Sequence, residues 1–335
     1  MVPALVLTAG LATRLRPLSL LRAKAALPVA GTPLIHRILR SLQSAGVRDV
    51  VLNLHHLPHT LTRLLGDGTD LGMHVRYSWE VPVLGSAGGP KRALPLLVNP
   101  EPATATIESG IPSPESRVSS PASTFLIVNG DTLTDLDLHA LVEAHRGSGA
   151  LVTMAVVPND QPDKYGGVVA APDGSVTGFV WRGSREPSFH FVGVQVAESE
   201  AFASVPANVP YETVSALYPA LLSQRPGAIR ACVTSGEFVD IGTSSDYLDT
   251  SLKLAAREGI DPRDGADIAS SARVERSVLW DGVVVEEGAM LRECVVTDHV
   301  RVPADTSWHG VTLRNAAGEL APGERRIGEL AVCSL

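Results

Sequence analysis

The stretch LTAGLATRLRPLSLLRAKAALPV, Leu7 to Val29, decides how the rest of the chain is interpreted. It overlaps the apolar run PALVLTA (3–9), which is typical of a parallel strand buried on both faces. Three arginines and a lysine follow Gly10. A glycine turn between such a strand and a helix is a usual phosphate site, because backbone N–H groups face the anion. An ordinary turn with solvated arginines would look the same, so the loop alone leaves both interpretations open.

The two best-known phosphate fingerprints are absent from this loop. Gly10 is followed by Leu11, Ala12 and Thr13, so the G-x-G-x-x-G spacing of dinucleotide-binding loops is not formed. No G-K-[ST] follows either, which excludes a P-loop. The meaning of the loop therefore depends on other residues of the chain.

The composition limits the classes of partner. The chain has 335 residues, 44% of them hydrophobic, which suits one large domain with an appendage. Its net charge is −8, from 28 basic and 36 acidic residues. Proteins that bind nucleic acid or anionic membranes usually present a basic surface, so we expect neither kind of partner.

The cysteines and the N-terminus indicate a cellular compartment. Cys232, Cys294 and Cys333 are widely spaced and show no metal-ligand pairing. The first ten residues lack the basic-then-apolar order of a signal peptide, and no run approaches the roughly 20 apolar residues of a membrane helix. We expect a soluble, cytoplasmic protein.

The first 98 residues alternate between strand and helix patterns. The segment 31–46 predicts a helix that closes at Gly46, with one apolar face made of Leu34, Ile35, Ile38, Leu39 and Leu42. Further strands are predicted at 47–54 and 74–80, and further helices at 57–68 and from about Ala87 to Val98. This alternation indicates right-handed crossovers and a parallel sheet.

Residues 99–123 interrupt the alternation. Pro, Ser, Thr and Glu dominate there, and so few apolar residues cannot offset the entropy of ordering, so we expect a flexible insertion. The pattern resumes at 124–131. The elements expected after it are a helix at 137–147, a strand at 150–157, a β-rich stretch at 166–197, a helix from about Glu212 to Leu222, a strand at 228–233, and a helix capped by Ser244 or Ser245.

The hydrophobic pattern of the sequence changes again from about residue 266. Short apolar pairs recur every five or six residues between turn-like residues, as in hexapeptide β-helix coils. A small antiparallel β-appendage is the alternative. Little more than two coils cannot be stable alone, so they must pack on the main domain or on another subunit. We therefore expect a catalytic domain over 1–260 and a β-helical domain over 266–335 that supports a homo-oligomer.

Two aspartates supply the chemistry that the loop alone does not define. Asp131 comes just after the buried run FLIVNG, and Asp240 lies in the tight turn FVDIGT. A single Asp is more often a turn or cap residue than a ligand. Two carboxylates beside a basic glycine loop could converge on one octahedral Mg²⁺, with phosphate and water oxygens completing the shell. The set favours metal-assisted phosphoryl or nucleotidyl transfer.

These motifs resemble, in their order, those of the sugar-1-phosphate nucleotidyltransferases, or NDP-sugar pyrophosphorylases. The family signature G-x-G-T-R-x-R-P-L-T, followed by P-K, is matched by GLATRLRPLS (10–19) and Ala23-Lys24. The later matches are Leu84-Gly85-Ser86-Ala87-Gly88-Gly89, Asn129-Gly130-Asp131, Tyr165-Gly166-Gly167 and Asp240-Ile241-Gly242-Thr243. The resemblance spans about residues 3–258, and a β-helical tail also occurs in many members.

The resemblance implies a fold and a reaction. The fold would be a Rossmann-like mixed, mainly parallel sheet flanked by helices, with a short left-handed β-helix as appendage. The reaction would convert an NTP and a sugar 1-phosphate into an NDP-sugar and pyrophosphate, with Mg²⁺. The texture is closest to mannose-1-phosphate guanylyltransferases. Uridylyl- and thymidylyltransferases stay open, as does a non-catalytic regulatory homologue that binds NDP-sugars.

The resemblance also implies roles for matched positions. Arg14 would reach the triphosphate, Lys24 would neutralise charge between the two substrates, and Asp131 with Asp240 would carry Mg²⁺. The positions implied to lie beside the nucleotide are Leu7, Ala9, Gly10, Thr13, Glu80, Gly85 and Gly88. The positions implied to face the sugar are Asn129, Gly167, Trp181 and Arg182.

The chain departs from the family pattern at three places. Ala12 replaces a glycine, and Ala23 replaces the proline before the lysine, which we expect to loosen that approach. Trp181 and Arg182 stand where the family has Glu-Lys, and an indole cannot accept a hydrogen bond from a sugar hydroxyl. Either the sugar stacks on Trp181, or a neighbour such as Glu186 compensates, or sugar specificity or catalysis has decayed.

Several other polar residues are weaker candidates. His55, His56 and His59 follow a strand end, and adjacent histidines point to different faces, so we do not expect a metal site. His190 faces either the pocket or solvent. Asp135 and Asp137 are expected to cap the next helix rather than to bind a metal.

Overall fold

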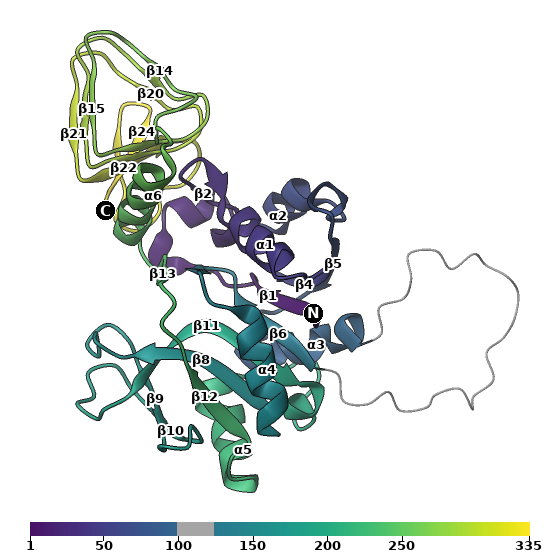
Figure 1. Cartoon of the computed structure of the whole chain (residues 1–335). Coiled ribbons are helices and arrows are strands. Elements are labelled where there is room, and N and C mark those ends of the chain that lie inside the picture. The colour runs from purple at the N-terminus through teal and green to yellow at the C-terminus, as the bar shows by residue number, and fades with distance from the viewer. Residues whose placement is uncertain (99–123) are drawn as a thin grey trace, which may run out of the picture. The chain divides into compact units, whose positions relative to one another are not determined.

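The computed structural model describes residues 1–98 and 124–335, and the predicted insertion at 99–123 lies outside them. The described chain divides into two compact units. The first, called here the sheet unit, comprises 1–10, 40–55 and the described part of 65–238. The second, called the β-helix unit, comprises 11–39, 56–64 and 239–335. Figure 1 shows the elements of both.

Four parallel strands form one half of the nine-stranded sheet in the sheet unit. They are β1 (Ala4–Leu7), β4 (Asp49–Leu54), β5 (His74–Trp79) and β6 (Thr124–Asn129), in the spatial order β6-β1-β4-β5. Leu7 is in register with both Asn53 and Asn129. Continuous apolar runs give buried strands here, as predicted. The segments that follow β1 and β6 therefore leave the sheet at the same edge.

The other half of the sheet is mostly antiparallel. Strand β11 (Phe189–Glu198) pairs antiparallel with β6, with β8 (Val152–Pro158) and with β9 (Gly167–Ala170). Beyond β9 lies β10 (Val176–Val180), while β12 (Ile229–Val233) runs parallel to β8. Two short strands, β7 (Thr132–Thr134) and β13 (Phe238–Asp240), are not part of this sheet. The fold is the mixed α/β sheet with a parallel core that the resemblance implies.

Helices form where the periodicity predicts them. In the sheet unit, α3 (Gly85–Val98) and α5 (Tyr218–Gln224) share one apolar core with the strands. Helix α4 (Leu138–Ser148) is capped by Asp137, whose carboxylate accepts a hydrogen bond from Ala140 N at 3.0 Å, so the prediction is confirmed for Asp137 and wrong for Asp135. Two more helices are α1 (Leu34–Ser44) and α2 (Pro58–Leu65), and all five apolar residues predicted to line α1 are buried. None of the helices in the described ranges is long and apolar enough to cross a membrane.

The predicted helix from Glu212 to Leu222 differs from the observed one. A π-helical turn spans Thr213–Leu217, and the α-helix α5 starts only at Tyr218. Pro219 has no N–H to donate to the carbonyl of Ser215, so regular α-helical hydrogen bonding cannot run through this point. The sequence pattern gave the right place but the wrong helix type.

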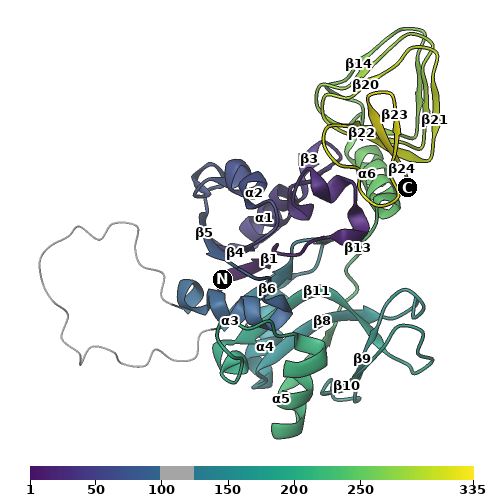
Figure 2. The same cartoon turned by 180° about the vertical axis from the view of Figure 1, so that it is seen from behind.

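Three parallel sheets build the C-terminal β-helix, visible as stacked triangular coils in Figures 1 and 2. Asp267 pairs with Val284 and Val284 with Arg301, a period of 17 residues. The sheets are β14 (Asp267–Ile268), β17 (Val284–Val285) and β20 (Arg301–Val302); β15 (Arg273–Glu275), β18 (Met290–Arg292) and β21 (Ser307–His309); and β16 (Val278–Leu279), β19 (Val295–Val296) and β22 (Val311–Asn315).

The β-helix confirms the hexapeptide interpretation over the antiparallel alternative, since its coils pair in parallel. It has three coils rather than little more than two, because each sheet contributes three strands. Strand β24 (Leu330–Ser334) pairs antiparallel with β22, and β23 (Arg325–Ile327) pairs antiparallel with β24, which extends that sheet. Valines and leucines of successive coils fill the interior.

The same unit contains the hairpin β2 (Pro28–Val29) and β3 (Thr32–Pro33) and the helix α6 (Ser244–Glu258). The predicted N-caps Ser244 and Ser245 are wrong. Thr243 caps α6: its hydroxyl accepts from Asp246 N at 3.1 Å, and the Asp246 carboxylate accepts from Thr243 N at 3.0 Å. This reciprocal capping box satisfies two orphan N–H groups, which neither serine achieves.

Candidate active site

A buried polar network lies under the end of β1. Thr8 N donates to Asn53 Oδ1 at 2.6 Å, and Asn53 Nδ2 donates to Glu80 Oε1 at 2.7 Å. The second oxygen of Glu80 accepts from Leu84 N at 2.8 Å, and the residue is only 1% exposed. Both Glu80 oxygens therefore serve internal contacts that tie the opening loop to the LGSAGG motif. Its expected place beside the nucleotide stays a prediction.

The glycines of the LGSAGG motif allow another chain segment to pack closely. A Cβ on Gly85 would lie 2.4 Å from Glu212 Oε1, and one on Gly88 would lie 2.7 Å from the carbonyl oxygen of Val209. The Ser86 hydroxyl donates to Glu212 at 2.6 Å and accepts from Thr213 N at 2.8 Å. Sequence reasoning missed Glu212, because a contact across 126 residues leaves no local pattern. Nucleotide binding by Gly85 and Gly88 stays a prediction.

Asp131 leaves the sheet beside the end of β1. Gly130 N donates to Leu7 O at 2.9 Å, and a Cβ on Gly130 would lie 2.6 Å from that oxygen. Asp131 is partly buried and accepts from the Thr132 hydroxyl at 3.3 Å. The structure thus brings together Leu7, Asn129 and Asp131 at one edge, with Ala9 buried and Gly10 exposed just beyond β1.

An aromatic cluster lies next to the predicted sugar-side glycine. The rings of Tyr165 and His190 are 4.0 Å apart between centroids, and those of His190 and Phe238 are 4.8 Å apart. Burial lowers the pKa of His190 to about 4. His190 is therefore packed between rings and neutral near pH 7. Gly167 is equally crowded, since a Cβ there would lie 2.1 Å from Ser188 Oγ.

Trp181 and Arg182 are exposed just after β10, and Trp181 is 77% exposed. The indole lines a groove of about 490 Å³ together with Phe179, Val214, Pro219 and Leu222. The groove lies between strand β10 and the π-turn and α5 segment. An exposed aromatic face of this kind suits stacking against an apolar sugar face.

Three predicted catalytic and metal residues come together in the β-helix unit. Lys24 Nζ lies 3.9 Å from Asp240 Oδ1, and the two side chains are 16% and 26% exposed. A Cβ on Gly242 would lie 3.6 Å from Arg14 Nη1, so the guanidinium lies beside the Asp-Ile-Gly-Thr turn. Thr13 is exposed in the same loop. The loop and the turn thus bring the cationic side chains of Arg14 and Lys24 close to the carboxylate-bearing turn of Asp240.

The metal prediction involves both units. Asp131 belongs to the sheet unit and Asp240 to the β-helix unit, so their convergence on one ion stays a prediction. Among residues 1–98 and 124–335, no group of three or more His, Cys, Asp and Glu side chains is placed to hold a metal ion. Two partly buried carboxylates fit Mg²⁺, which usually takes its remaining ligands from substrate phosphates and water.

The two alanine departures have backbone angles that a glycine and a proline can also adopt. Ala12 has φ 47° and ψ 47°, a left-handed conformation in which glycine costs least. Ala23 has φ −54°, which a proline would also adopt. Its N–H, which proline lacks, donates to Thr60 Oγ1 at 3.1 Å. The loosening expected at Ala23 is therefore offset by a new hydrogen bond.

We expect Ala12→Gly to stabilise the protein by about 1 kcal/mol, because it removes the steric cost of a Cβ at positive φ. Ala203, exposed and at φ −58°, is the matched control, and Ala203→Gly should lower the free energy of unfolding by about 0.5–1 kcal/mol. Urea unfolding measures both. Destabilisation by Ala12→Gly would contradict the left-handed conformation.

A pH series on His190→Phe tests the aromatic cluster. The folded pKa of about 4 lies below the ordinary 6.5, so the unfolded chain binds the proton more strongly. This contribution to stability is complete above pH 6.5 and is lost as the pH falls toward 4. As the pH falls from 6.5 toward 4, we therefore expect the free energy of unfolding of the wild type to decrease relative to that of His190→Phe. A difference that does not change with pH would refute the buried, neutral ring.

Comparisons with known proteins identify the family of the chain. Residues 3–257 match the family model described as nucleotidyl transferase, and residues 263–314 match the GlmU-like, C-terminal hexapeptide model. A mannose-1-phosphate guanylyltransferase of Mycobacterium tuberculosis is 28% identical over 90% of this chain and 82% of its own length. A UTP–glucose-1-phosphate uridylyltransferase of Synechocystis is 26% identical over 98% of this chain and 86% of its own length.

Solved structures share the fold at low identity. HddC from Yersinia pseudotuberculosis has a TM-score of 0.60 and 22% identity, covering 76% of this chain and all of its own. A putative glucose-1-phosphate thymidylyltransferase from Bacillus anthracis has a TM-score of 0.61 and 16% identity, covering 76% and 95%. Because one family model accounts for most of the chain and a second for the β-helix coils, the chain belongs to the nucleotidyl transferase family, as an enzyme with a C-terminal GlmU-like hexapeptide segment.

Proposed function

We propose that this enzyme transfers a nucleotidyl group from an NTP to a sugar 1-phosphate, forming an NDP-sugar and pyrophosphate. The observation that carries the proposal is the grouping of Arg14, Lys24 and Asp240 at the signature loop. Mannose 1-phosphate and GTP are the leading substrates, because a guanylyltransferase of that specificity is 28% identical over most of both chains. A uridylyl- or thymidylyltransferase on another sugar is the alternative, supported by the relatives with those names.

In the proposed mechanism, a phosphate oxygen of the sugar 1-phosphate attacks the α-phosphorus of the NTP. The bond to the bridging oxygen breaks opposite, and pyrophosphate leaves. The attacking oxygen is already anionic, so no side-chain nucleophile or base is needed. The residues align two polyanions and neutralise their charge. Arg14 faces the triphosphate, and Lys24, positioned by its pair with Asp240, lies between the substrates.

Asp131 and Asp240 are the residues that would hold Mg²⁺. When bound there, the ion neutralises phosphate oxygens and orients them for in-line transfer. Asp131 is positioned by Gly130, whose N–H bonds to the end of β1, and Asp240 by the turn that leads into α6. Each carboxylate is thus fixed by backbone close to its own strand or helix end.

The sugar end is where this chain differs most from its family. Asn129 and Gly167 match the family positions, whereas Trp181 offers an exposed ring in place of a hydrogen-bond acceptor. We propose that the indole stacks on the sugar and that the exposed Arg182 contacts its phosphate. The missing acceptor is also the feature that favours the rival, a non-catalytic protein that binds NDP-sugars.

Pyrophosphate release, measured over the four NTPs and a panel of sugar 1-phosphates with Mg²⁺, tests the reaction. We expect Asp131→Asn and Asp240→Asn each to lower turnover about 100-fold or more, because each removes a charge opposite the phosphates. Asp137→Asn is the matched control, since asparagine caps a helix as well as aspartate does.

Normal turnover in Asp131→Asn or Asp240→Asn would remove that residue from the metal site. Binding of NDP-sugars by the wild type without turnover of any substrate pair would favour the regulatory homologue.

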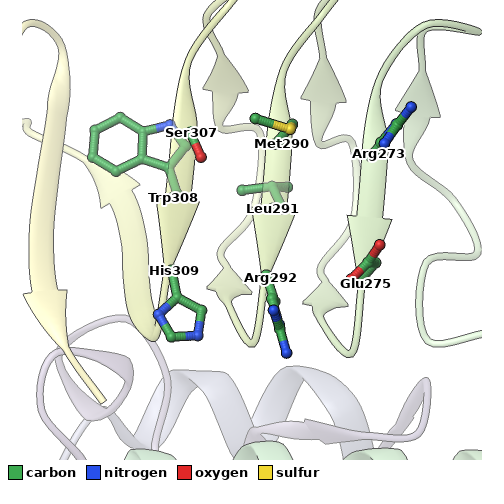
Figure 3. A pocket seen from close by; sticks show the side chains of 8 residues that line it. All are labelled: Arg273, Glu275, Met290, Leu291, Arg292, Ser307, Trp308 and His309. Atoms are coloured by element: carbon green, nitrogen blue, oxygen red, sulfur yellow. The ribbon is translucent and has the colours of Figure 1, made fainter.

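We further propose that the β-helix joins copies of the chain into a homo-oligomer. The face of the sheet β15-β18-β21 carries a groove of about 390 Å³ (Figure 3). Leu291 and Trp308 lie between two rows of side chains, Arg273, Met290 and Ser307 on one side and Glu275, Arg292 and His309 on the other. Met290 is 47% exposed, and both charge signs are present, so the face can complement a second copy.

Sedimentation velocity of the full chain tests this face. We expect Met290→Glu to weaken association at least tenfold, because a carboxylate replaces an apolar contact. Ile327→Glu is the control, since Ile327 is also 45% exposed but lies on β23. Equal mass distributions for Met290→Glu and wild type would exclude the face.

A further inference from the structure

Arg22 lies two residues before Lys24, in the turn between two short 3₁₀ segments of the signature loop. Its side chain does not point freely into solvent, since it is 23% exposed. It belongs to the β-helix unit, together with Lys24 and the coils. Neither the family signature nor the proposed reaction gives Arg22 a role.

The Arg22 guanidinium contacts the coils in two ways. Nη2 lies 2.8 and 2.7 Å from the two carboxylate oxygens of Asp298. The guanidinium carbon lies 5.0 Å from the ring centroid of Trp280, the geometry of a cation–π contact. Asp281, one coil before Asp298, is 3.8 Å away but 85% exposed, so Asp298 is the main partner.

Trp280 also connects to the far end of the segment that carries Lys24, which runs from Arg22 to Pro28. Trp280 is 3% exposed, and its Nε1 donates to the hydroxyl of Tyr247 at 2.8 Å. That hydroxyl donates to the carbonyl oxygen of Pro28. Burial raises the pKa of Tyr247, so the phenol keeps its proton. The segment from Arg22 to Pro28 is thus held at both ends by one cluster built on the β-helix and α6.

Lys24 lies between these two anchors. Its ammonium is 3.9 Å from Asp240, and the neighbouring Ala23 is 1% exposed and bonded to Thr60. A backbone anchored on both sides leaves the lysine little freedom to drift from its partner. Loss of one anchor would free the segment without removing any group that contacts substrate.

We infer that Arg22 is a positioning residue, and that the β-helix, through Asp298 and Trp280, clamps the loop that carries Lys24. The inference rests on the proposed function for the role of Lys24. The β-helix then serves the reaction directly, in addition to any part in assembly. Transfer depends on the placement of a cation between two polyanions, so small displacements of Lys24 lower the rate of the chemical step.

The test compares Arg22→Ala, Asp298→Ala and the double variant of the full chain. We expect each to lower kcat about tenfold or more, with KM for the NTP changed less than about twofold. The double variant should fall no further than Arg22→Ala alone, because the Asp298 contact is already lost when Arg22 is removed. Arg301→Ala is the matched control: it breaks a 2.8 Å ion pair with Glu286 on the coil surface, and kcat should not change.

Hydrogen exchange provides a readout that does not need turnover. In Arg22→Ala, amides between residues 22 and 28 should exchange about tenfold faster or more, with the strands of the sheet unit unchanged. Unchanged exchange would overturn the clamp. A lower melting temperature with unchanged kcat would overturn the positioning role. A wild type without turnover on any substrate pair overturns the proposed function, and the exchange result then decides the clamp alone.

Discussion

The double pairing of β1 is the constraint from which the sheet unit follows. Four residues long, the strand is hydrogen-bonded to β4 on one side and β6 on the other, with Ala4, Leu5 and Val6 fully buried. A slip of one residue would turn its apolar side chains over and disrupt two ladders at once. The strand end is therefore fixed, and with it the place where the loops bearing Gly10 and Asp131 leave the sheet.

Tight internal contacts continue that constraint beyond the strands. A carboxylate buried like that of Glu80 is very costly unless it is paired, and Asn53 and Leu84 N supply its partners. Gly85 and Gly88 have no room for a Cβ, because residues 209–213 pack against them. The family motif is thus explained in part by packing, and its glycines need not all touch a ligand. Motif residues can serve the shape of a site as well as its chemistry.

The sequence predicted what repeats or follows a period. The apolar stripe of α1 and the coil spacing of the β-helix are periodic, so both were placed correctly. Features that depend on single residues were harder to predict from the sequence. Thr243 caps α6 because its capping-box partner, Asp246, lies three residues later. The π-turn before α5 depends on Pro219, and the contacts of Glu212 and Arg22 join segments 126 and 276 residues apart. Contacts of that range follow from the fold and leave no local pattern.

The departures from the family differ in kind. Ala12 has a left-handed backbone that suits a glycine, and Ala23 has a φ that a proline would adopt, so neither position requires a backbone that the family residue could not adopt. Trp181 is different, because an exposed aromatic face stands where the resemblance implies a hydrogen-bond acceptor. Under the proposed function, the first two changes concern the transfer step and the third concerns specificity. The phosphate chemistry is common to all the substrate pairs considered, so selection on it would hold the loop fixed while the sugar contacts change.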